Sequence, residues 1–527
     1  MEPGTTKKGR QMPEQAQEET LGRTRLLPDD ADDQALLALV HPGDWQNPTP
    51  RRCYDLAVLG GGSGGLVAAA AAAGLGARVA LVERDLLGGD CLNAGCVPSK
   101  TLLRSAHWAA EMRRGPDLGW TTSFNHPATP SEVLRRVRRV RAALAPTDSA
   151  RRFRDDLGVD VFFGEARFFA KNRVEVDGVG LGFRRAIIAT GARPNRPLIA
   201  GLDPAEILTN ETIFALAQPP RRLVVLGGGP VGCELAQAFA RLGTQCLLVQ
   251  RNKRLLPREE EDASNLVESA LRADGVEILL EAELESAVRR PEGLVAEIRQ
   301  GKQTRSVIVD SLLVATGRRP NTEALHLDSA GIATRNDGSI ATDTRLRTAN
   351  RRVFAVGDVT LSERFTHAAD ASARIAVRNA LFFGRSRYLP ERIPRSTYTD
   401  PEVASIGLLP TEAQGRGIAY ETLEVRFEEN DRARTEEQVA GFVRAHFAPK
   451  SGKLLGATVV GDHAGDLIGE FAVLLAAVMP LSRLADVVHP YPTRAEAVRR
   501  IGDLYNRRRL TPRAARLLRA IARLPRR

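Results

Sequence analysis

The chain has 527 residues, of which 43% are hydrophobic and 26% charged, a composition typical of a soluble globular protein with about three domains. Its net charge of +11 falls to +2 when the nine arginines from Arg507 onward are set aside, which argues against a nucleic-acid-binding body. Five scattered cysteines are too few for a disulfide scaffold. The polar N-terminus lacks the apolar stretch of a secretory signal, so we expect a cytoplasmic protein whose leader, residues 1–50, is mostly disordered and ends in a docked segment at 41–50.

A glycine-rich turn follows the first predicted strand. Gly60, Gly62 and Gly65 form the pattern G-x-G-x-x-G between that strand and an alanine-rich helix, and Glu83 ends the next predicted strand. In dinucleotide-binding units the glycines permit a tight turn and a close approach of the backbone to a pyrophosphate, while the acid accepts a ribose hydroxyl. We therefore predict a dinucleotide site here, because a glycine-rich turn alone would not explain the strand, the helix and the acid in this order.

Two cysteines, Cys91 and Cys96, follow this unit with four residues between them. A helix predicted at 97–108 places both thiols at its N-terminal end, where peptide dipoles favour a thiolate. The alternatives are a pair of buried cysteines or half of a zinc site. Zinc ligands are usually spaced more tightly, and no second Cys/His pair lies nearby in the sequence. We predict a redox-active disulfide and no metal.

The glycine pattern recurs in the middle of the chain, at Gly227, Gly229 and Gly232. Two copies imply two dinucleotide sites, one nested inside the domain of the other. The strand after the second copy ends in Gln250 and Arg251 rather than in an acid. A carboxylate would repel a 2′-phosphate whereas arginine pairs with it, so we expect NADPH rather than NADH at this site. The alternative for Arg251 is a solvated loop residue.

The remaining chain predicts further elements. An arginine-rich amphipathic helix at 131–144 is expected to turn its charged face to solvent. Two buried strands, at 185–189 and 312–315, each run into an Ala-Thr-Gly turn. From residue 393 onward, alternating strands surround an apolar helix at 467–479, which indicates a third domain of mixed α and β structure.

Together these motifs resemble the FAD-dependent pyridine nucleotide-disulfide oxidoreductases, a family that includes glutathione reductase, dihydrolipoamide dehydrogenase and mercuric reductase. The resemblance covers about residues 51–505 and is nearest to the mercuric-reductase branch in the segments 236–243 and 250–252. The sequence elements that carry it are the two glycine patterns, the stretch Cys91–Lys100, both Ala-Thr-Gly turns, Gly357-Asp358 and Pro492-Thr493-x-x-Glu496.

The resemblance implies an α/β fold with two Rossmann-like dinucleotide-binding domains, one nested in the other, and a C-terminal α+β dimerisation domain. The implied divisions are a leader at 1–50, the first part of the FAD domain at 51–204, the NAD(P) domain at 205–324, the second part of the FAD domain at 325–390, the dimerisation domain at 391–505 and a basic tail at 506–527.

The resemblance also implies roles for single residues. Cys96 would lie against the flavin, Cys91 would meet the electron acceptor, and Lys100 would pair with Glu234 near the flavin ring. The residues implied to bind FAD are Gly60, Gly62, Gly65, Glu83, Gly89, Lys100, Gly164, Ala166, Thr190, Gly191 and Asp358. Those implied to bind NADPH are Gly227, Gly229, Gly232, Glu234, Gln250, Arg251 and Gly317.

The acid–base group is where this sequence departs from two members of the family. Glutathione reductase and dihydrolipoamide dehydrogenase have a histidine directly before Pro-Thr, and Tyr491 stands there in this chain, followed by Glu496 at the family's glutamate position. Mercuric reductase also has a tyrosine there. A tyrosine, with a reference pKa near 10, is a poor proton shuttle at neutral pH. His489 and His367 are further candidates for this work, with a structural role and helix capping as their alternatives.

These features predict a homodimeric enzyme that passes electrons from NADPH through FAD and Cys91–Cys96 to a small acceptor, since the 492–496 motif in this family completes the partner's site. The alternatives are a dihydrolipoamide dehydrogenase that uses NAD⁺, and a slow, redox-sensing or membrane-recruited flavoprotein. Mercuric reductase carries a C-terminal cysteine pair and an N-terminal metal-binding module, and this sequence shows neither, which argues against mercury as the physiological acceptor. The sequence leaves the acceptor open among a metal ion, a disulfide, a quinone and a reactive chlorine or oxygen species. The segment 510–524 predicts a basic amphipathic helix capable of weak contact with an anionic membrane or a partner surface. The alternatives are a helix that packs on the body of the protein and a disordered segment.

Overall fold

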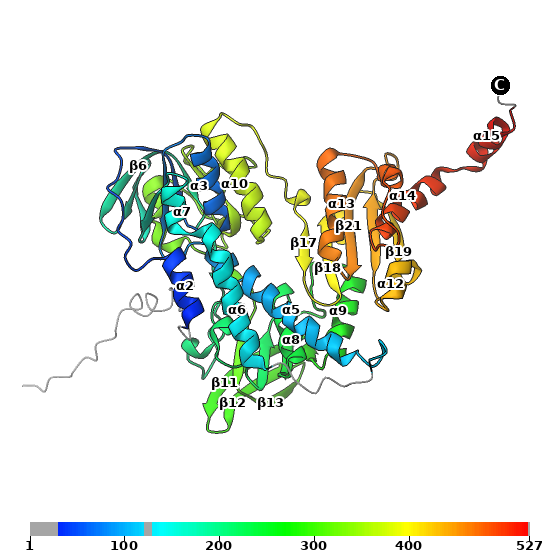
Figure 1. Cartoon of the computed structure of the whole chain (residues 1–527), viewed down its shortest axis with the longest axis horizontal. Helices are drawn as coiled ribbons and strands as arrows, with labels where there is room; N and C mark the ends of the chain where they lie inside the picture. The colour runs from blue at the N-terminus through cyan, green and yellow to red at the C-terminus, as the bar shows by residue number, and fades with distance from the viewer. Residues whose placement is uncertain (1–29, 121–128, 525–527) are drawn as a thin grey trace, which may run out of the picture.

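The computed structural model describes residues 30–120 and 129–524, which form three packed sheet units and a C-terminal helix that extends away from them (Figure 1). The first unit is a seven-stranded sheet of order β3-β2-β1-β6-β5-β4, with β16 paired to β6. Helices α3 and α10 pack side by side against it. Its elements are β1 Tyr54–Leu59, α3 Ser63–Gly74, β2 Val79–Glu83, α4 Gly89–Asn93, α5 Cys96–Arg113, α6 Pro130–Leu144, α7 Ala150–Asp155, β3 Asp160–Phe163, β4 Ala166–Ala170, β5 Arg173–Val176, β6 Val179–Ile188, β16 Val353–Ala355 and α10 Thr366–Leu381.

The first sheet is buried on both faces. Leu56 and Val58 of β1 belong to the core beneath α3, while Ala57 and Leu59 belong to the core on the opposite face. Strands β3, β2, β1, β6 and β16 run parallel. A parallel strand covered on both sides needs an unbroken apolar sequence, and this is why β1 reads as a continuous hydrophobic run.

The second unit is a parallel four-stranded sheet of order β10-β9-β8-β14, with an antiparallel three-stranded sheet beside it. Its strands lie in the chain between β6 and β16 of the first sheet, which is the nested arrangement that we expected. A two-stranded ribbon of β7 and β15 joins the two units. The elements are β7 Ala192–Pro194, β8 Arg222–Leu226, α8 Pro230–Arg241, β9 Gln245–Gln250, α9 Glu261–Ala273, β10 Glu277–Leu280, β11 Ala282–Arg290, β12 Gly293–Gln300, β13 Gln303–Val309, β14 Ser311–Val314 and β15 Arg318–Pro320.

The third unit is an antiparallel five-stranded sheet of order β17-β18-β21-β20-β19, whose core includes residues of α13 and α14. The predicted α/β class, with a C-terminal α+β domain, is confirmed. No helix among the described residues is long and apolar enough to cross a bilayer. The elements are β17 Arg395–Thr397, β18 Glu402–Gly407, α11 Pro410–Gly415, β19 Glu421–Arg426, α12 Asp431–Thr435, β20 Phe442–Phe447, β21 Leu454–Gly461, α13 Ala464–Ala477, α14 Glu496–Arg509 and α15 Pro512–Ala522.

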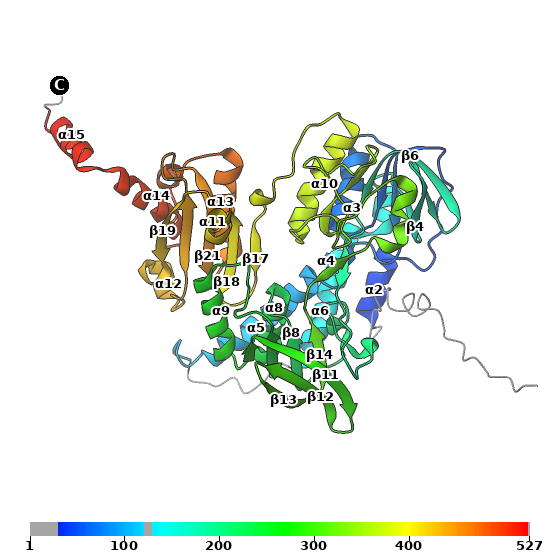
Figure 2. The same cartoon turned by 180° about the vertical axis from the view of Figure 1, so that it is seen from behind.

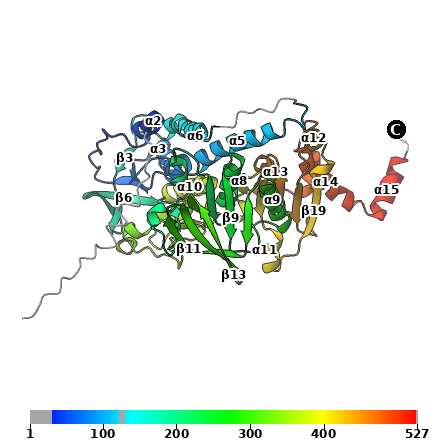
Figure 3. The ribbon, with the colours of Figure 1, turned by 90° about the horizontal axis from the view of Figure 1, so that it is seen from below.

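The N-terminal segment contains a helix that the sequence did not suggest. Helix α2, Ala31–Val40, packs against α6 (Figures 1 and 3), so the docked part of the leader begins at Asp30 rather than near His41. Residues 1–29 lie outside the described part of the chain. The prediction that the arginines of α6 face solvent was wrong for Arg138 and Arg141, which are buried and pair with Asp30 and Asp33. Those acids come from about a hundred residues earlier in the chain, so the pattern of α6 alone could not reveal them.

Helix α3 lies close to the turn that precedes it because Gly65 has no side chain. A Cβ at Gly65 would lie 1.8 Å from the carbonyl oxygen of Gly60. We expect Gly65→Ala to lower the free energy of unfolding by about 1–3 kcal/mol or more, because helix α3 must move away from the turn. Gly74→Ala, in the same helix, is the control: nothing lies within 4 Å of its Cβ, and the change is expected to be neutral or stabilising. Chemical denaturation measures both, and equal stabilities of the two variants would contradict this packing.

Candidate functional site

The two glycine patterns fold into turns of the same geometry. Gly60 and Gly227 have φ angles of +107° and +105°, and a Cβ on either would lie 2.4 or 2.6 Å from the carbonyl oxygen of Ala189 or Ala315. A Cβ on Gly232 would lie 1.8 Å from the carbonyl oxygen of Gly227, the same distance as a Cβ on Gly65 from that of Gly60. The first and last glycines of each pattern are therefore required by backbone packing, and they bring a strand, a turn and a helix N-terminus together.

The middle glycine of each pattern faces open space instead. A Cβ on Gly229 would have no atom within 4 Å, and one on Gly62 would meet only the Cα of Gly89, at 3.7 Å. Both residues are the N-caps of their helices, α3 and α8, where free N–H groups and the helix dipole attract an anion. The space that a side chain would fill thus fits the pyrophosphate of a dinucleotide at both sites.

The two sites differ at the strand that follows. The N–H of Gly61 donates to Glu83 Oε2 at 2.5 Å, and in the second site the N–H of Gly228 donates to Gln250 Oε1 at 3.3 Å. Gln250 therefore occupies the place that Glu83 has in the first site, without its charge. Arg251 follows it and is exposed.

The other residues expected to bind FAD lie at one edge of the first sheet. Gly164 follows β3, Thr190 and Gly191 follow β6, and Asp358 follows β16, so all face the carboxyl edge where Gly60 and Glu83 lie. Ligands of parallel α/β sheets bind at this edge. Burial raises the pKa of the Asp358 carboxyl, although Arg318, 3.5 Å away, opposes the shift. Ala166 begins β4, and Gly317 follows β14 at the corresponding edge of the second sheet.

The cysteine pair lies where two helices begin. Cys91 is on the short helix α4 and Cys96 is the first residue of α5, while Thr366, the first residue of α10, places its hydroxyl oxygen 3.2 Å from the Cys96 sulfur. The neighbouring Cys91 thiol, helped by Thr366 and by the charge of Lys100, lowers the pKa of Cys96 to about 6 against the effect of burial. The proximity of Cys96, together with burial, raises the pKa of Cys91. At neutral pH the pair is therefore one thiolate and one thiol.

Lys100 and Glu234 form an ion pair, as expected, with Nζ 2.7 Å from Oε2. The other carboxylate oxygen of Glu234 accepts the backbone N–H of Tyr398 at 2.9 Å, and the Lys100 ammonium lies 4.4 Å from the centre of the Tyr398 ring. Burial lowers the pKa of Lys100, but Glu234 outweighs it and raises the net value, so the lysine stays charged. This contact joins α5, α8 and the start of the third unit one helical turn from Cys96.

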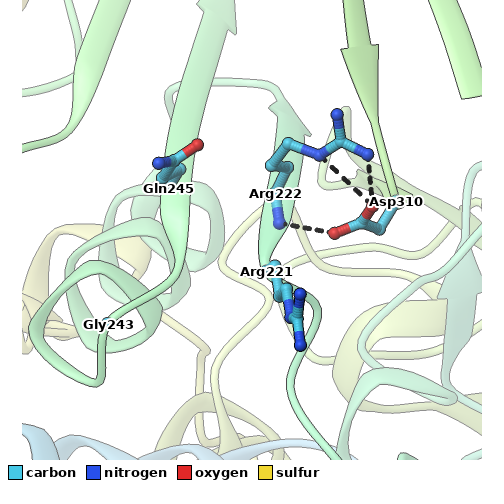
Figure 4. A pocket seen from close by; sticks show the side chains of 5 residues that line it. All are labelled: Arg221, Arg222, Gly243, Gln245 and Asp310. Carbon is cyan, nitrogen blue, oxygen red and sulfur yellow. Dashed lines mark hydrogen bonds and ion pairs between the residues drawn. The ribbon is translucent and has the colours of Figure 1, made fainter. Parts of the chain in front are cut away.

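A cavity of about 400 Å³ opens beside Cys96, and three cations line it: Lys100, Arg104 and Arg136. Nearby positive charge favours a thiolate. A cavity of about 450 Å³ lies elsewhere, lined by Arg221, Arg222, Gly243, Gln245 and Asp310 (Figure 4). It lies at the amino ends of β8, β9 and β14, opposite the edge that carries the glycine turn, and Arg222 is already paired with Asp310. The chemistry therefore centres on the cavity beside Cys96.

The candidate acid–base residues are not brought to the cysteines within one chain. The Tyr491 hydroxyl donates to Asp431 at 2.8 Å, and its side chain is 71% exposed. His489 donates to Glu470 at 3.1 Å, and Glu496 begins α14 and pairs with Arg499 at 3.4 Å. Among the described residues, none of these side chains has a hydrogen bond with Cys91 or Cys96. His367 follows Thr366 but donates to the carbonyl oxygen of Pro394 at 2.7 Å.

Some residues of the site gave no signal in the sequence. Thr366 beside Cys96 and Tyr398 beside Lys100 belong to no motif, and their role depends on long-range packing. Asn210 donates to the Asp90 carboxylate at 2.9 Å and to the Ala94 carbonyl at 3.1 Å, and so holds the loop between the cysteines.

The family model described as pyridine nucleotide-disulphide oxidoreductase matches residues 54–374, and the dimerisation domain of the same family matches residues 393–501. A mercuric reductase of Streptomyces lividans is 37% identical over 456 residues, covering 85% of this chain and 95% of the relative. A dihydrolipoyl dehydrogenase of Bacillus subtilis is 32% identical over 450 residues, covering 84% and 94%.

Solved structures agree with this assignment. LpdA from Mycobacterium tuberculosis has a TM-score of 0.78 at 28% identity, covering 86% of this chain and 99% of its own. The HOCl-induced flavoprotein disulfide reductase RclA from Escherichia coli, as a Cu(II) complex, has a TM-score of 0.75 at 27% identity, covering 86% and 100%. The expected resemblance, including that to mercuric reductases, is confirmed. The chain belongs to the pyridine nucleotide-disulphide oxidoreductases, FAD-dependent enzymes that take electrons from NAD(P)H.

Proposed function

We propose that this chain, as a homodimer, passes two electrons from NADPH through FAD and the Cys91–Cys96 pair to a small acceptor. The observation that carries the proposal is the pair of neighbouring thiols with opposite pKa shifts at the converging starts of α5 and α10, where Thr366 lies 3.2 Å from the Cys96 sulfur. The domain divisions predicted from the sequence assign FAD to 51–204 with 325–390, and NADPH to 205–324.

FAD, when bound, supplies the chemistry that accepts a hydride from the nicotinamide and delivers an electron pair to a disulfide. The chain's own residues do the rest. The glycine turns hold the two pyrophosphates, and Lys100 with Glu234 keeps a fixed charge pair beside the flavin site. Reduction of the disulfide consumes two electrons and one proton and leaves a Cys91 thiol and a Cys96 thiolate; transfer of the electron pair to the acceptor reverses this.

Tyr491 bears on the kind of acceptor. Its hydrogen bond to Asp431 raises the pKa of the hydroxyl, so the side chain stays protonated and cannot exchange protons readily near neutral pH. Reduction of a disulfide substrate releases a thiolate that needs a proton, whereas reduction of a metal ion does not. We therefore rank a metal ion ahead of a disulfide such as lipoamide. The mercuric reductases among the relatives and the Cu(II) complex of RclA support this order.

The electron path predicts the behaviour of the two cysteines. We expect Cys91→Ser and Cys96→Ser each to lower acceptor-dependent NADPH oxidation by at least about a hundredfold, because either change removes the dithiol. The assay follows NADPH absorbance with metal ions, lipoamide, glutathione disulfide, quinones and hypochlorous acid as acceptors. Cys53→Ser, at a half-buried cysteine outside the pair, serves as the control. Activity that survives both substitutions with every acceptor would place the disulfide off the electron path, and wild-type turnover too slow to measure with any of them would favour a sensor.

The preference for NADPH rests on Gln250 and Arg251. A carboxylate in the place of Gln250 would repel a 2′-phosphate, and Arg251 is exposed, with no ion pair to any described residue. Arginine binds phosphate in a bidentate manner that suits this position. Gln250 and Arg251 at the end of β9, where the first site has Glu83, therefore distinguish this nucleotide site from the FAD site.

We expect Arg251→Ala to raise the KM for NADPH about tenfold or more and to leave the KM for NADH unchanged, because a charge-assisted contact is lost only with the phosphorylated nucleotide. Steady-state kinetics with both nucleotides measure this. Lys302→Ala, at an exposed turn between β12 and β13, is the control for a general loss of positive charge. An equal loss with both nucleotides would mean that Arg251 does not contact the 2′-phosphate.

The basic tail supports a second, weaker proposal, of contact with an anionic membrane surface. Helix α15 has no buried residue and extends from the body (Figure 2). Leu517, Leu518 and Ile521 are more than half exposed, and Arg513, Arg516 and Arg519 lie among them on the same helix. Exposed apolar side chains among cations are typical of helices that lie at a lipid interface.

We expect the full chain to sediment with phosphatidylserine vesicles at low salt and the chain without residues 510–527 to remain in solution. This deletion spares Arg508, which pairs with Glu421 in the third unit. Neutral phosphatidylcholine vesicles test whether charge is needed. Equal sedimentation of the full and shortened chains would contradict the proposal.

A further inference from the structure

A buried set of polar contacts connects helix α2 to the loop between the two cysteines. Arg141 of α6 is 4% exposed, and Asp33 of α2 is fully buried. One guanidinium nitrogen of Arg141, Nη2, donates to the Asp33 carboxylate, and the other, Nη1, donates to the backbone carbonyl of Asn93 at 3.0 Å. Asn93 lies two residues after Cys91 and three before Cys96. A single arginine therefore joins a helix near the N-terminus to the middle of the redox loop.

The side chain of Asn93 fastens the same loop from within. Its amide nitrogen donates to the carbonyl oxygens of Leu87, at 3.0 Å, and Gly89, at 2.8 Å. Gly89 in turn packs against Gly62 of the first glycine turn, where a Cβ on Gly89 would lie 2.6 Å from the Gly62 Cα. The position of Asn93 thus fixes the cysteines relative to the FAD site as well as to each other.

Helix α2 is anchored at both ends. Asp30 caps its first turn and pairs with Arg138 at 2.6 Å, and at its last residue the Val40 carbonyl accepts the N–H of Leu87 at 3.2 Å. His41 donates to the carbonyl of Asp85 at 2.5 Å. Helix α2 lies outside residues 54–374, which the family model matches. Its support of the loop is therefore a feature that the family assignment does not include.

We propose that Asp33 and Arg141 are positioning residues for the redox loop: the ion pair brought by α2 holds Asn93, and so fixes the position of Cys91 relative to Cys96. This rests on the proposed redox role of the pair. The geometry requires arginine at residue 141, because its two terminal nitrogens reach two partners in different directions, which a lysine ammonium would not reproduce.

Loss of the contact between Arg141 and Asn93 would change the position of Cys91 relative to Cys96. The groups that act on Cys96 are Cys91 and Asp90 from α4, Lys100 from α5 and Thr366 from α10. Of these groups, Cys91 has the largest effect on the pKa of Cys96. Its position depends on the loop between the two cysteines, which contains Asn93. When the loop is free to relax, Cys91 moves relative to Cys96, and the Cys96 thiolate forms at higher pH.

The test compares two variants of the same helix interface in the flavin-loaded protein. Asp33→Leu with Arg141→Met removes the ion pair and the contact with Asn93 but fills the buried space with apolar atoms, an exchange that proteins often tolerate. Arg138→Met is the matched control, since Arg138 is equally buried and pairs with α2 but has no hydrogen bond with Asn93. The reduced proteins are alkylated with iodoacetamide across pH, with the modified cysteine located by mass spectrometry and Tm measured by circular dichroism.

We expect alkylation of the Cys91–Cys96 pair to reach half its maximal rate about one pH unit higher in the double variant than in the wild type, because the influence of Cys91 on Cys96 weakens. Arg138→Met should keep the wild-type pH profile even if its Tm falls. An unchanged profile in the double variant, or an equal change in Arg138→Met, would overturn the proposal. Alkylation does not need electron transfer, so if the Cys91→Ser and Cys96→Ser enzymes keep their activity, the proposed function fails while this measurement still decides the role of Arg141.

Discussion

The close placement of the Cys91 and Cys96 thiols is the constraint on which the proposed site depends. A thiolate on one sulfur disfavours a second thiolate beside it, so the pair loses its two protons in separate steps. Here Cys91, with Thr366 and Lys100, lowers the pKa of Cys96 to about 6, while the pKa of Cys91 rises. In the proposed electron path, a pair in this state holds two electrons with only one proton. The two side chains lie near each other because α4 ends at Asn93 and α5 begins at Cys96, which places both cysteines in one short segment.

The rest of the fold places this pair relative to two nucleotides. Parallel strands collect their turns at one edge of a sheet, and both glycine turns use that edge in the same way, down to matching contacts of Gly65 and Gly232. The Lys100–Glu234 ion pair, with Tyr398 against both, then joins the two sheets and the third unit. Since each of these three residues comes from a different unit, the arrangement around Cys96 requires all three units to be packed together.

The sequence predicts the parts of this site that depend on short spacing. Glycines, Glu83 and the two cysteines lie within about 40 residues and follow the geometry of one strand, turn and helix, so their pattern was sufficient. It could not predict Thr366, Tyr398 or the burial of Arg141, because their partners lie more than a hundred residues away. Helix α6 illustrates this limit of sequence-based prediction. Its amphipathic pattern was predicted correctly, but Arg138 and Arg141 are buried because they pair with Asp30 and Asp33.

Tyr491 lies in the part of the chain that matches the family's dimerisation domain. Its side chain is 71% exposed and bonded to Asp431 of the same unit, and the neighbouring Val488 is 93% exposed, so both are open to contact with a second chain. The groups that act on Cys96 all come from its own chain, and the lowered pKa of this cysteine therefore needs no partner. In the proposed homodimer, by contrast, any contact of Tyr491 with the acceptor depends on how the two subunits join.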